Sequence, residues 1–186
     1  MKLKIIIVLV FLFFLLILFS GCLENLECEK TVDCKFADFN SSQAFFCPED
    51  SCANQLIQAF NSADENIDIA IYSFTHERIY NALIQAKQRG VNIRVVLDFQ
   101  QSQTQYSVKD FLIENNVDLR IDNKPGLMHN KFAVIDNSIV FTGSFNYSLN
   151  GDTRNDENLV LLTEPSTIQA FALEFEEIWN ESRLPE

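Results

Sequence analysis

Positive charge is scarce in this chain: its 186 residues include 14 Lys and Arg against 26 Asp and Glu, and the formal net charge is −12 at pH 7. Proteins that bind nucleic acid without sequence preference rely on Lys and Arg to displace counterions from phosphates. The acidic balance therefore argues against a dedicated nucleic-acid-binding module, although an enzyme needs only a local positive site. Tandem repeats and low-complexity segments are also missing, and the length suits one domain with a sizeable core.

Polar side chains are missing from residues 5–19, a run of apolar residues that follows Lys2 and Lys4. A buried core helix would show a polar face, and this run shows none. A basic start, an apolar stretch of this length and small residues before a break are typical of a signal peptide. The run is also nearly long enough to cross a bilayer. We therefore predict that residues 1–23 are a signal peptide or an N-terminal membrane anchor.

Two fates of this leader agree with the sequence. The stretch "FSGC" resembles a lipoprotein cleavage box, in which Cys22 would be lipidated and become the new N-terminus. Alternatively, the leader stays uncleaved as an anchor. In both cases the lysines stay in the cytoplasm, because positive flanks are retained inside. We expect the rest of the chain to lie outside the cytoplasm, either attached to the membrane or secreted.

Cysteine is absent after residue 52, and all five cysteines lie in one short region: Cys22, Cys28, Cys34, Cys47 and Cys52. If Cys22 is lipidated, the other four suffice for two disulfides with three possible pairings, as suits an oxidising compartment. A zinc site is the alternative. The spacing within the two pairs, five and four residues, is loose for a zinc ribbon, so we favour disulfides.

The pattern of apolar residues predicts an α/β domain. Residues 24–46 are polar and weakly periodic, so we expect a loop-rich extension there, followed by a folded body over residues 47–186. Alternation of strands and helices in the first half of the body indicates a parallel sheet, and a hairpin follows it, so the whole sheet should be mixed. Strands are expected at 67–74, 91–99, 117–121, 129–136, 139–143 and 157–162, and helices at 51–63, 77–90, near 106–116 and from 165 onward.

The stretch "MHNKFAVIDNSIVFTGSFN", residues 128–146, begins with polar residues where a core strand would alternate apolar and polar ones. His129 and Lys131 are two apart, so on a strand they point to the same face. Asp136 stands at an odd offset from His129, and an unbroken strand would aim it at the other face. Taken alone, the pair could equally be a core histidine beside a surface lysine.

The second half of the stretch adds further polar groups. Ser144 and Asn146 are two apart and again share a face, and Gly143 lets the backbone approach closely. One surface could thus gather an imidazole, an ammonium, a hydroxyl and an amide. A fixed cation, neutral donors and a nucleophile or proton carrier are the groups that suit a phosphoryl oxyanion.

The full pattern, His129-x-Lys-x4-Asp-x6-Gly-Ser-x-Asn146, is similar to the HKD motif of the phospholipase D superfamily. The resemblance extends from about Ala44 to Trp179, through "IYSFT", "RGVNIRVVLD", "PGLMHNKFAVID", "NDENLVLL" and "FEEIW". These segments resemble the small members with a single motif, namely the bacterial Nuc-type endonuclease and the mitochondrial cardiolipin hydrolase (Zucchini) branch. The resemblance implies the phospholipase D fold, a mixed β-sheet flanked by helices, and makes residues 47–186 a phospholipase D-like catalytic domain.

The resemblance also implies a mechanism that needs two histidines. In the family, one imidazole attacks phosphorus and forms a phosphohistidine, the other protonates the leaving oxygen, and neither a metal nor another cofactor takes part. This chain has one motif, and its only other histidine, His76, lies outside any such pattern. A homodimer with a shared active site is therefore implied, and cyclic twofold pairing is the commonest symmetry of oligomers.

The resemblance assigns a role to each motif residue. His129 is implied to be nucleophile or general acid, depending on the subunit. Lys131 and Asn146 would hold phosphate oxygens, and Ser144 would support them by hydrogen bonding. Glu157, in "NDENLVLL", matches the family acid that orients a catalytic imidazole. The remaining motif residues, Asp136 and Gly143, are expected to be structural.

Three functions remain open at this point. The first is a metal-independent phosphodiesterase acting as a Nuc-like endonuclease on DNA or RNA. The second is a phospholipase D that acts on membrane phospholipid headgroups, which the predicted tether and the acidic surface favour. The third is an inactive anchored interaction module, against which the intact motif argues. The expected partners are a second copy of the chain, a nucleic acid or phospholipid substrate, and the membrane through the N-terminal segment.

Overall fold

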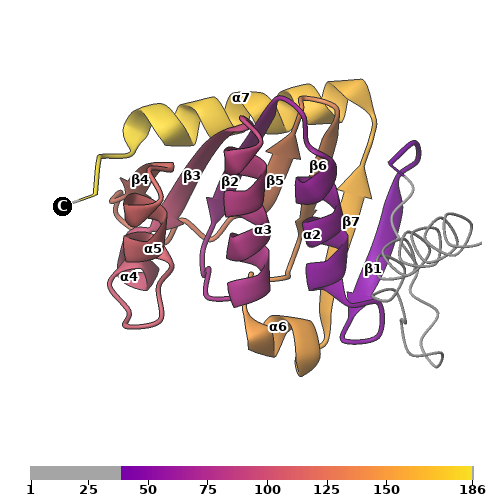
Figure 1. Cartoon of the computed structure of the whole chain (residues 1–186), viewed down its shortest axis with the longest axis horizontal. Coiled ribbons are helices and arrows are strands. Elements are labelled where there is room, and N and C mark those ends of the chain that lie inside the picture. The colour runs from indigo at the N-terminus through magenta and orange to yellow at the C-terminus, as the bar shows by residue number, and fades with distance from the viewer. Residues whose placement is uncertain (1–38, 186) are drawn as a thin grey trace, which may run out of the picture. The chain divides into compact units, whose positions relative to one another are not determined.

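Seven strands form one mixed sheet in the computed structural model, which describes residues 39–185 (Figure 1). Their order is β1-β7-β6-β5-β2-β3-β4. The three strands of the parallel half are β2 (Asn66–Ile71), β3 (Asn92–Asp98) and β4 (Asp118–Asp122). The antiparallel half consists of β5 (Lys131–Ile135), β6 (Ile139–Gly143), β7 (Glu157–Leu162) and β1 (Gln43–Cys47). The mixed α/β architecture predicted from the sequence is confirmed.

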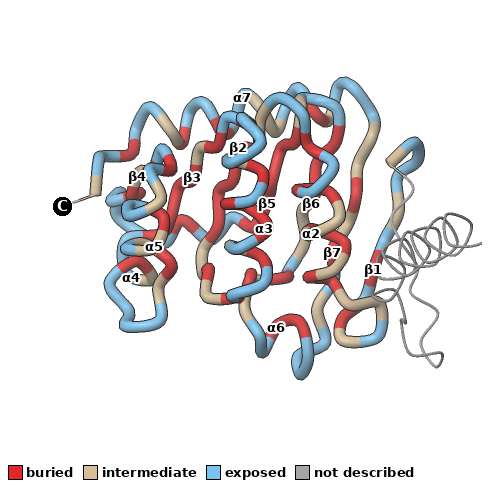
Figure 2. Tube along the Cα trace, viewed as in Figure 1, coloured by how far each residue is buried: buried red, intermediate tan, exposed pale blue. Residues whose placement is uncertain are grey.

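Helices cover both faces of this sheet. The helices α2 (Cys52–Ser62) and α3 (Glu77–Gln88) pack over one face, and α7 (Pro165–Glu181) packs over the other. Three short helices are α4 (Phe99–Ser102), α5 (Lys109–Glu114) and α6 (Leu149–Thr153). Figure 2 shows that the strands between these layers are buried along most of their length, whereas the outer faces of the helices are exposed.

Side chains of the central strands alternate between two apolar cores. In β5, Phe132 and Val134 join the core under α7, whereas Ala133 and Ile135 join the core under α2 and α3. This is the period of two that a strand imposes on its side chains. Both faces of β5 are covered, so its apolar residues form a continuous run rather than an alternating pattern.

Three details differ from the sequence-based expectation. Residues 43–46, assigned to the loop-rich extension, form β1 together with Cys47, because the backbone groups along the outer edge of β7 take a pairing partner there. The helix expected near 106–116 is present as the shorter α5, and the additional short helix α4, which was not predicted, directly follows β3. The turn between β5 and β6 is centred on Asp136 and Asn137, both with positive φ, one residue earlier than predicted.

One disulfide is present in the described part of the chain. It joins Cys47, the last residue of β1, to Cys52, the first residue of α2. These two cysteines are therefore disulfide-bonded, as we favoured over a zinc site. The predicted leader and Cys22, Cys28 and Cys34 lie outside the described residues. Among residues 39–185, no helix has the length and apolar character needed to span a bilayer.

Candidate active site

Several strands end at the same edge of the sheet, and the motif residues other than Asp136 lie there. Parallel strands β2 and β3 end at this edge, and antiparallel pairing places Lys131, the first residue of β5, opposite Ile71, the last residue of β2. β6 ends and β7 begins at the same edge, where Gly143 pairs with Leu159. The short helix α6 lies beside it (Figure 1). The fold therefore brings residues distant in sequence to one place.

His129 and Lys131 share an aromatic neighbour. His129 is exposed and lies in the loop just before β5, so it is outside the strand that we predicted to begin there. Its imidazole packs on the ring of Tyr72, with ring centroids 4.5 Å apart and planes tilted by 59°. The Nζ atom of Lys131 lies 5.2 Å from the centroid of the same ring. The side chains of His129 and Lys131 thus point toward the same neighbour, Tyr72, in agreement with the shared face that their spacing predicted.

The ammonium group of Lys131 is largely removed from water. The residue is 8% exposed, and its Nζ donates a hydrogen bond to the backbone oxygen of His129 at 2.8 Å. Burial lowers the pKa of Lys131, and the charge of Glu157 acts in the opposite direction. A cation in such a place attracts a phosphoryl oxygen more strongly than a fully hydrated one would, because less water screens it.

Ser144 and Glu157 form a hydrogen-bonded pair between β6 and β7. The hydroxyl of Ser144 donates to Oε2 of Glu157 at 2.5 Å and accepts from the backbone N–H of Asn158 at 3.1 Å. The other carboxylate oxygen, Oε1, accepts from Nδ2 of Asn155 at 3.1 Å. These contacts fix the carboxylate at the start of β7. The predicted contact between Glu157 and an imidazole stays a prediction.

Gly143 is required by the close approach of two strands. A Cβ atom at this position would lie 2.3 Å from the backbone oxygen of Asn158, and the backbone has a φ of 148° that side chains disfavour. The absence of a side chain lets β6 lie against β7, and this brings Ser144 to Glu157. A close backbone approach was predicted at Gly143, and the backbone that approaches it is that of Asn158 in β7.

Asn146 lies in the loop that follows β6, two residues after Ser144. Its Oδ1 atom is buried and has no hydrogen-bond partner in the part of the chain that the structure describes. The following residue, Tyr147, is buried, and its backbone oxygen accepts hydrogen bonds from the N–H groups of Thr75 and His76 at 2.8 and 2.9 Å. The loop that carries Asn146 is thereby attached to the segment after β2.

His76 does not face this surface. It precedes α3, is buried, and its Nε2 lies 3.4 Å from Oδ2 of Asp152 in α6. Burial alone would raise the pKa of Asp152, but the close contact with His76, the hydrogen bond from the backbone N–H of Ala53 and the charge of Arg78 leave it lowered. His76 therefore supports the loop behind the motif.

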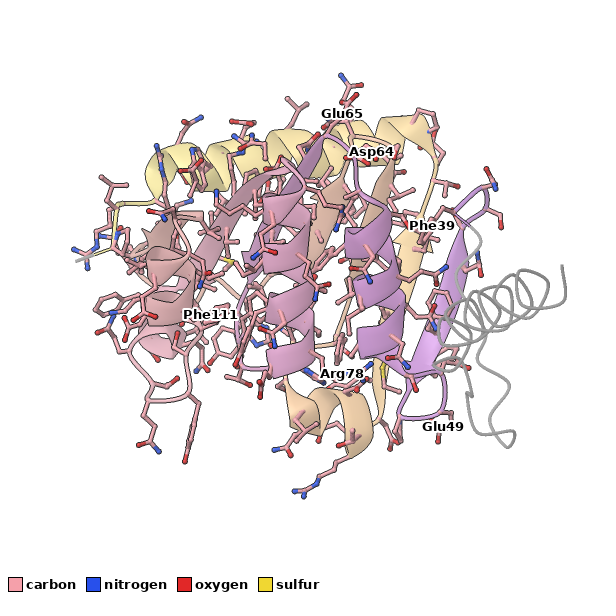
Figure 3. The ribbon with its side chains drawn as sticks, viewed as in Figure 1. Phe39, Glu49, Asp64, Glu65, Arg78 and Phe111 are labelled. Carbon is pink, nitrogen blue, oxygen red and sulfur yellow. A yellow bond between two sulfur atoms is a disulfide. The ribbon has the colours of Figure 1, made fainter. Side chains whose placement is uncertain are left out.

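Asp136 lies at the opposite edge of the sheet. One carboxylate oxygen accepts from the N–H groups of Glu65 and Asn66 at 2.8 and 2.9 Å, and the other accepts from that of Asp64 at 3.0 Å. Figure 3 labels Asp64 and Glu65 at this edge, away from α6. The carboxylate ties the β5–β6 turn to the start of β2, which is a structural role, as its odd offset from His129 indicated.

We expect Asp136→Ala to lower the free energy of unfolding by roughly 2 kcal/mol, because three backbone N–H groups lose a charged acceptor that water replaces only in part. Urea unfolding of the full-length chain, followed by circular dichroism, measures this loss. Ser138→Ala in the same turn is the matched control and should change stability by less than about 0.5 kcal/mol. Equal effects in the two variants would contradict the role given to Asp136.

Tyr72, Gln101 and Asp98 also belong to the site, and no pattern in the sequence predicted them. Tyr72 contacts both His129 and Lys131, and its hydroxyl accepts a hydrogen bond from Nε2 of Gln101 at 3.2 Å. The available signal was the stretch "IYSFT", in which a tyrosine directly follows an apolar strand. Its neighbours in space are distant in sequence, Gln101 by 29 positions and His129 and Lys131 by more, so no local pattern could assign them.

Comparison with known proteins gives the family. A family model described as "Cardiolipin synthase, PLD-like domain" matches residues 56–179. A phospholipase D of Rickettsia prowazekii (strain Madrid E) is 34% identical over 126 residues, which are 68% of this chain and 62% of that protein. A mitochondrial cardiolipin hydrolase of Chlamydomonas reinhardtii is 30% identical over 127 residues, 68% of this chain and 57% of that protein.

A solved structure extends this result to the fold. The phospholipase D family member Nuc from Salmonella typhimurium is similar with a TM-score of 0.73 and 32% identity, covering 77% of this chain and 96% of that one. The chain thus spans about three fifths of the two relatives found by sequence and nearly all of the solved one. With the motif from His129 to Asn146 intact, the chain belongs to the phospholipase D superfamily, in the group whose members carry a single HKD motif.

Proposed function

We propose that the protein is a phosphodiesterase that works through a phosphohistidine and needs no metal ion. In the first step, an imidazole nitrogen of His129 attacks phosphorus, and a P–N bond forms as the P–O bond to the leaving group breaks. A second imidazole donates a proton to the leaving oxygen. Water then attacks phosphorus, the P–N bond breaks, and the second imidazole takes the proton from water.

The observation that supports this most is the exposed imidazole of His129 beside the nearly buried ammonium of Lys131. A nucleophile must be accessible to substrate, and a charge-stabilising group acts best where water is scarce. Lys131 and Asn146 would hold the phosphoryl oxygens. Ser144 would support them, and Glu157 keeps Ser144 in place through their hydrogen bond.

The second imidazole has to come from another molecule in this proposal. His76 is buried against Asp152 and is not presented to a substrate. We therefore infer a homodimer in which the His129 side chains of two copies face each other across a twofold axis. Glu157 would then orient the imidazole of the other copy, as its counterpart does in the family.

We take nucleic acid as the first substrate class. The chain resembles the Nuc-type endonuclease in its compact build, and the solved structure of Nuc matches over almost its whole length. The acidic net charge requires that the positive charge at the site be local, and Lys131 supplies it. Under this proposal the enzyme cleaves DNA or RNA outside the cytoplasm.

Phospholipid headgroups are the second candidate, and one observation favours them. Large apolar side chains are exposed at the edge that carries the motif: Phe46 is 59% exposed, Leu127 50% and Leu149 60%. Such residues suit contact with a lipid surface. Residues 1–23, as a lipoprotein leader or uncleaved anchor, would hold the enzyme at the outer side of a membrane, whereas a plain signal peptide would release it.

The test is a substrate panel given to the purified full-length chain in the presence of EDTA. We expect cleavage of single-stranded DNA or RNA that survives EDTA and is lost in His129→Ala. Release of headgroups from phospholipid vesicles, with nucleic acid left intact, would assign the second candidate. Hydrolysis that stops on addition of EDTA would contradict the metal-independent mechanism. A folded chain without activity on any of these diesters would favour the inactive interaction module.

A further inference from the structure

We propose that Tyr72 is a positioning residue for both reactive groups of the site, held in place by Gln101 and Asp98. This inference rests on the proposed phosphodiesterase activity for its kinetic part, but the contacts of Tyr72 do not depend on that activity. Tyr72 follows β2 directly, so a residue of the parallel half of the sheet supports side chains of the antiparallel half.

The backbone of Tyr72 fixes the segment that joins the two reactive groups. Its N–H donates to the backbone oxygen of Asn130 at 2.8 Å. This bond extends the pairing of β2 with β5 beyond the pair Ile71 and Lys131. Asn130 lies between His129 and Lys131, so the peptide that connects them is held against β2.

The ring of Tyr72 is held from the other side by α4. Nε2 of Gln101 donates to the Tyr72 hydroxyl at 3.2 Å. The carboxylate of Asp98, 1% exposed, accepts from the N–H of Gln101 at 3.0 Å and, through its other oxygen, from the N–H of Met128 at 3.1 Å. One buried side chain thus connects the helix that holds Tyr72 to the residue that precedes His129.

An aromatic ring suits this position because it interacts favourably with a cation. The face of a tyrosine attracts an ammonium ion within about 6 Å, and the Nζ of Lys131 lies 5.2 Å from the ring centroid. The titratable groups that face Lys131 are Glu157 from β7, His129 from its own segment and Tyr72 itself. Tyr72 and Glu157 both favour the charged form, and burial opposes it.

The sign of the pH effect follows from this balance. Burial already lowers the pKa of Lys131, and removal of the ring would lower it further because the ammonium loses an attractive neighbour. In a titration toward alkaline pH, the ammonium of the variant would then lose its proton at a lower pH than that of the wild type. Activity that needs this cation should therefore begin to decline at a lower pH in the variant than in the wild type.

The experiment compares Tyr72→Leu and Tyr72→Phe in the full-length chain, with Tyr106→Leu as the control because Tyr106 is 73% exposed. The pH dependence of kcat and KM is measured with bis(4-nitrophenyl) phosphate. We expect Tyr72→Leu to lose about tenfold in kcat/KM and its alkaline limb to move down by about half a pH unit. Tyr72→Phe keeps the ring, so its alkaline limb should stay in place and most activity should return.

Two outcomes would overturn the inference. One is a Tyr72→Leu variant with the alkaline limb of the wild type, and the other is a Tyr72→Phe variant as impaired as Tyr72→Leu. If the wild type cleaves no diester, the proposed function fails, and an NMR titration of Lys131 decides the inference separately. Its pKa should then be lower in Tyr72→Leu than in the wild type and unchanged in Tyr72→Phe.

Discussion

The His129→Ala variant should hydrolyse diesters at least about 10,000-fold more slowly than the wild type, because it removes the nucleophile and, in the proposed dimer, the general acid as well. His129 is exposed, so the free energy of unfolding should change by less than about 0.5 kcal/mol. Single-turnover hydrolysis and urea unfolding of the full-length chain measure the two effects. Asn130→Ala is the matched control, since its side chain is exposed and only its backbone contacts Tyr72.

The same variant tests the shared site. When dissociated subunits of wild type and His129→Ala are mixed and re-formed with a tenfold excess of the variant, activity per wild-type chain should fall to about a tenth. The reason is that almost every wild-type chain is then paired with a copy that lacks its imidazole. Activity that stays proportional to the amount of wild type would show that one chain suffices, and would refute the dimer model.

The second large effect is expected for Lys131→Ala, with a loss of about 1,000-fold in kcat/KM. Lys131 is nearly buried at the site, so water screens its charge weakly and does not make up for its loss. Lys131→Arg should recover only part of the activity, because the planar guanidinium cannot reproduce the hydrogen bond from Nζ to the backbone oxygen of His129.

Lys124→Ala is the control for charge alone. Lys124 is half-exposed and pairs with Glu181 at the end of α7 rather than with a residue of the motif. The variant removes the same formal charge from the chain and should keep nearly full activity. Initial rates at several substrate concentrations separate kcat from KM. Comparable losses in Lys124→Ala and Lys131→Ala would mean that overall charge, rather than the position of Lys131, determines the rate.

Two strands of the antiparallel half, β6 and β7, could be predicted well because their residues carry strong local signals. β6 and β7 lie where the apolar runs at 139–143 and 157–162 placed them. β1 was missed because it is an edge strand whose position depends on pairing with a segment more than a hundred residues away. His129 lies just before its strand rather than in it, since sequence patterns locate the ends of elements poorly.

The candidate site could be predicted residue by residue only where a motif carried it. The spacing of His129, Lys131 and Ser144 is a local property, and the fold gathers these residues at one edge of the sheet. The support from Tyr72 and Asp98 depends on contacts between separate strands and helices. Such contacts leave no trace in spacing, so the sequence alone could not reveal them.

Two intervals of the motif, from Lys131 to Asp136 and from Asp136 to Gly143, each correspond to the distance from one edge of the sheet to the other. β5 runs from Lys131 at the reactive edge to Ile135, Asp136 follows in the turn at the far edge, and β6 returns to Gly143. The spacing of the motif therefore matches the lengths of two successive strands, β5 and β6. A single residue inserted into or deleted from β5 would change the register of Asp136 relative to His129, and one in β6 would change the register of Ser144 relative to His129, even with every chemical group retained.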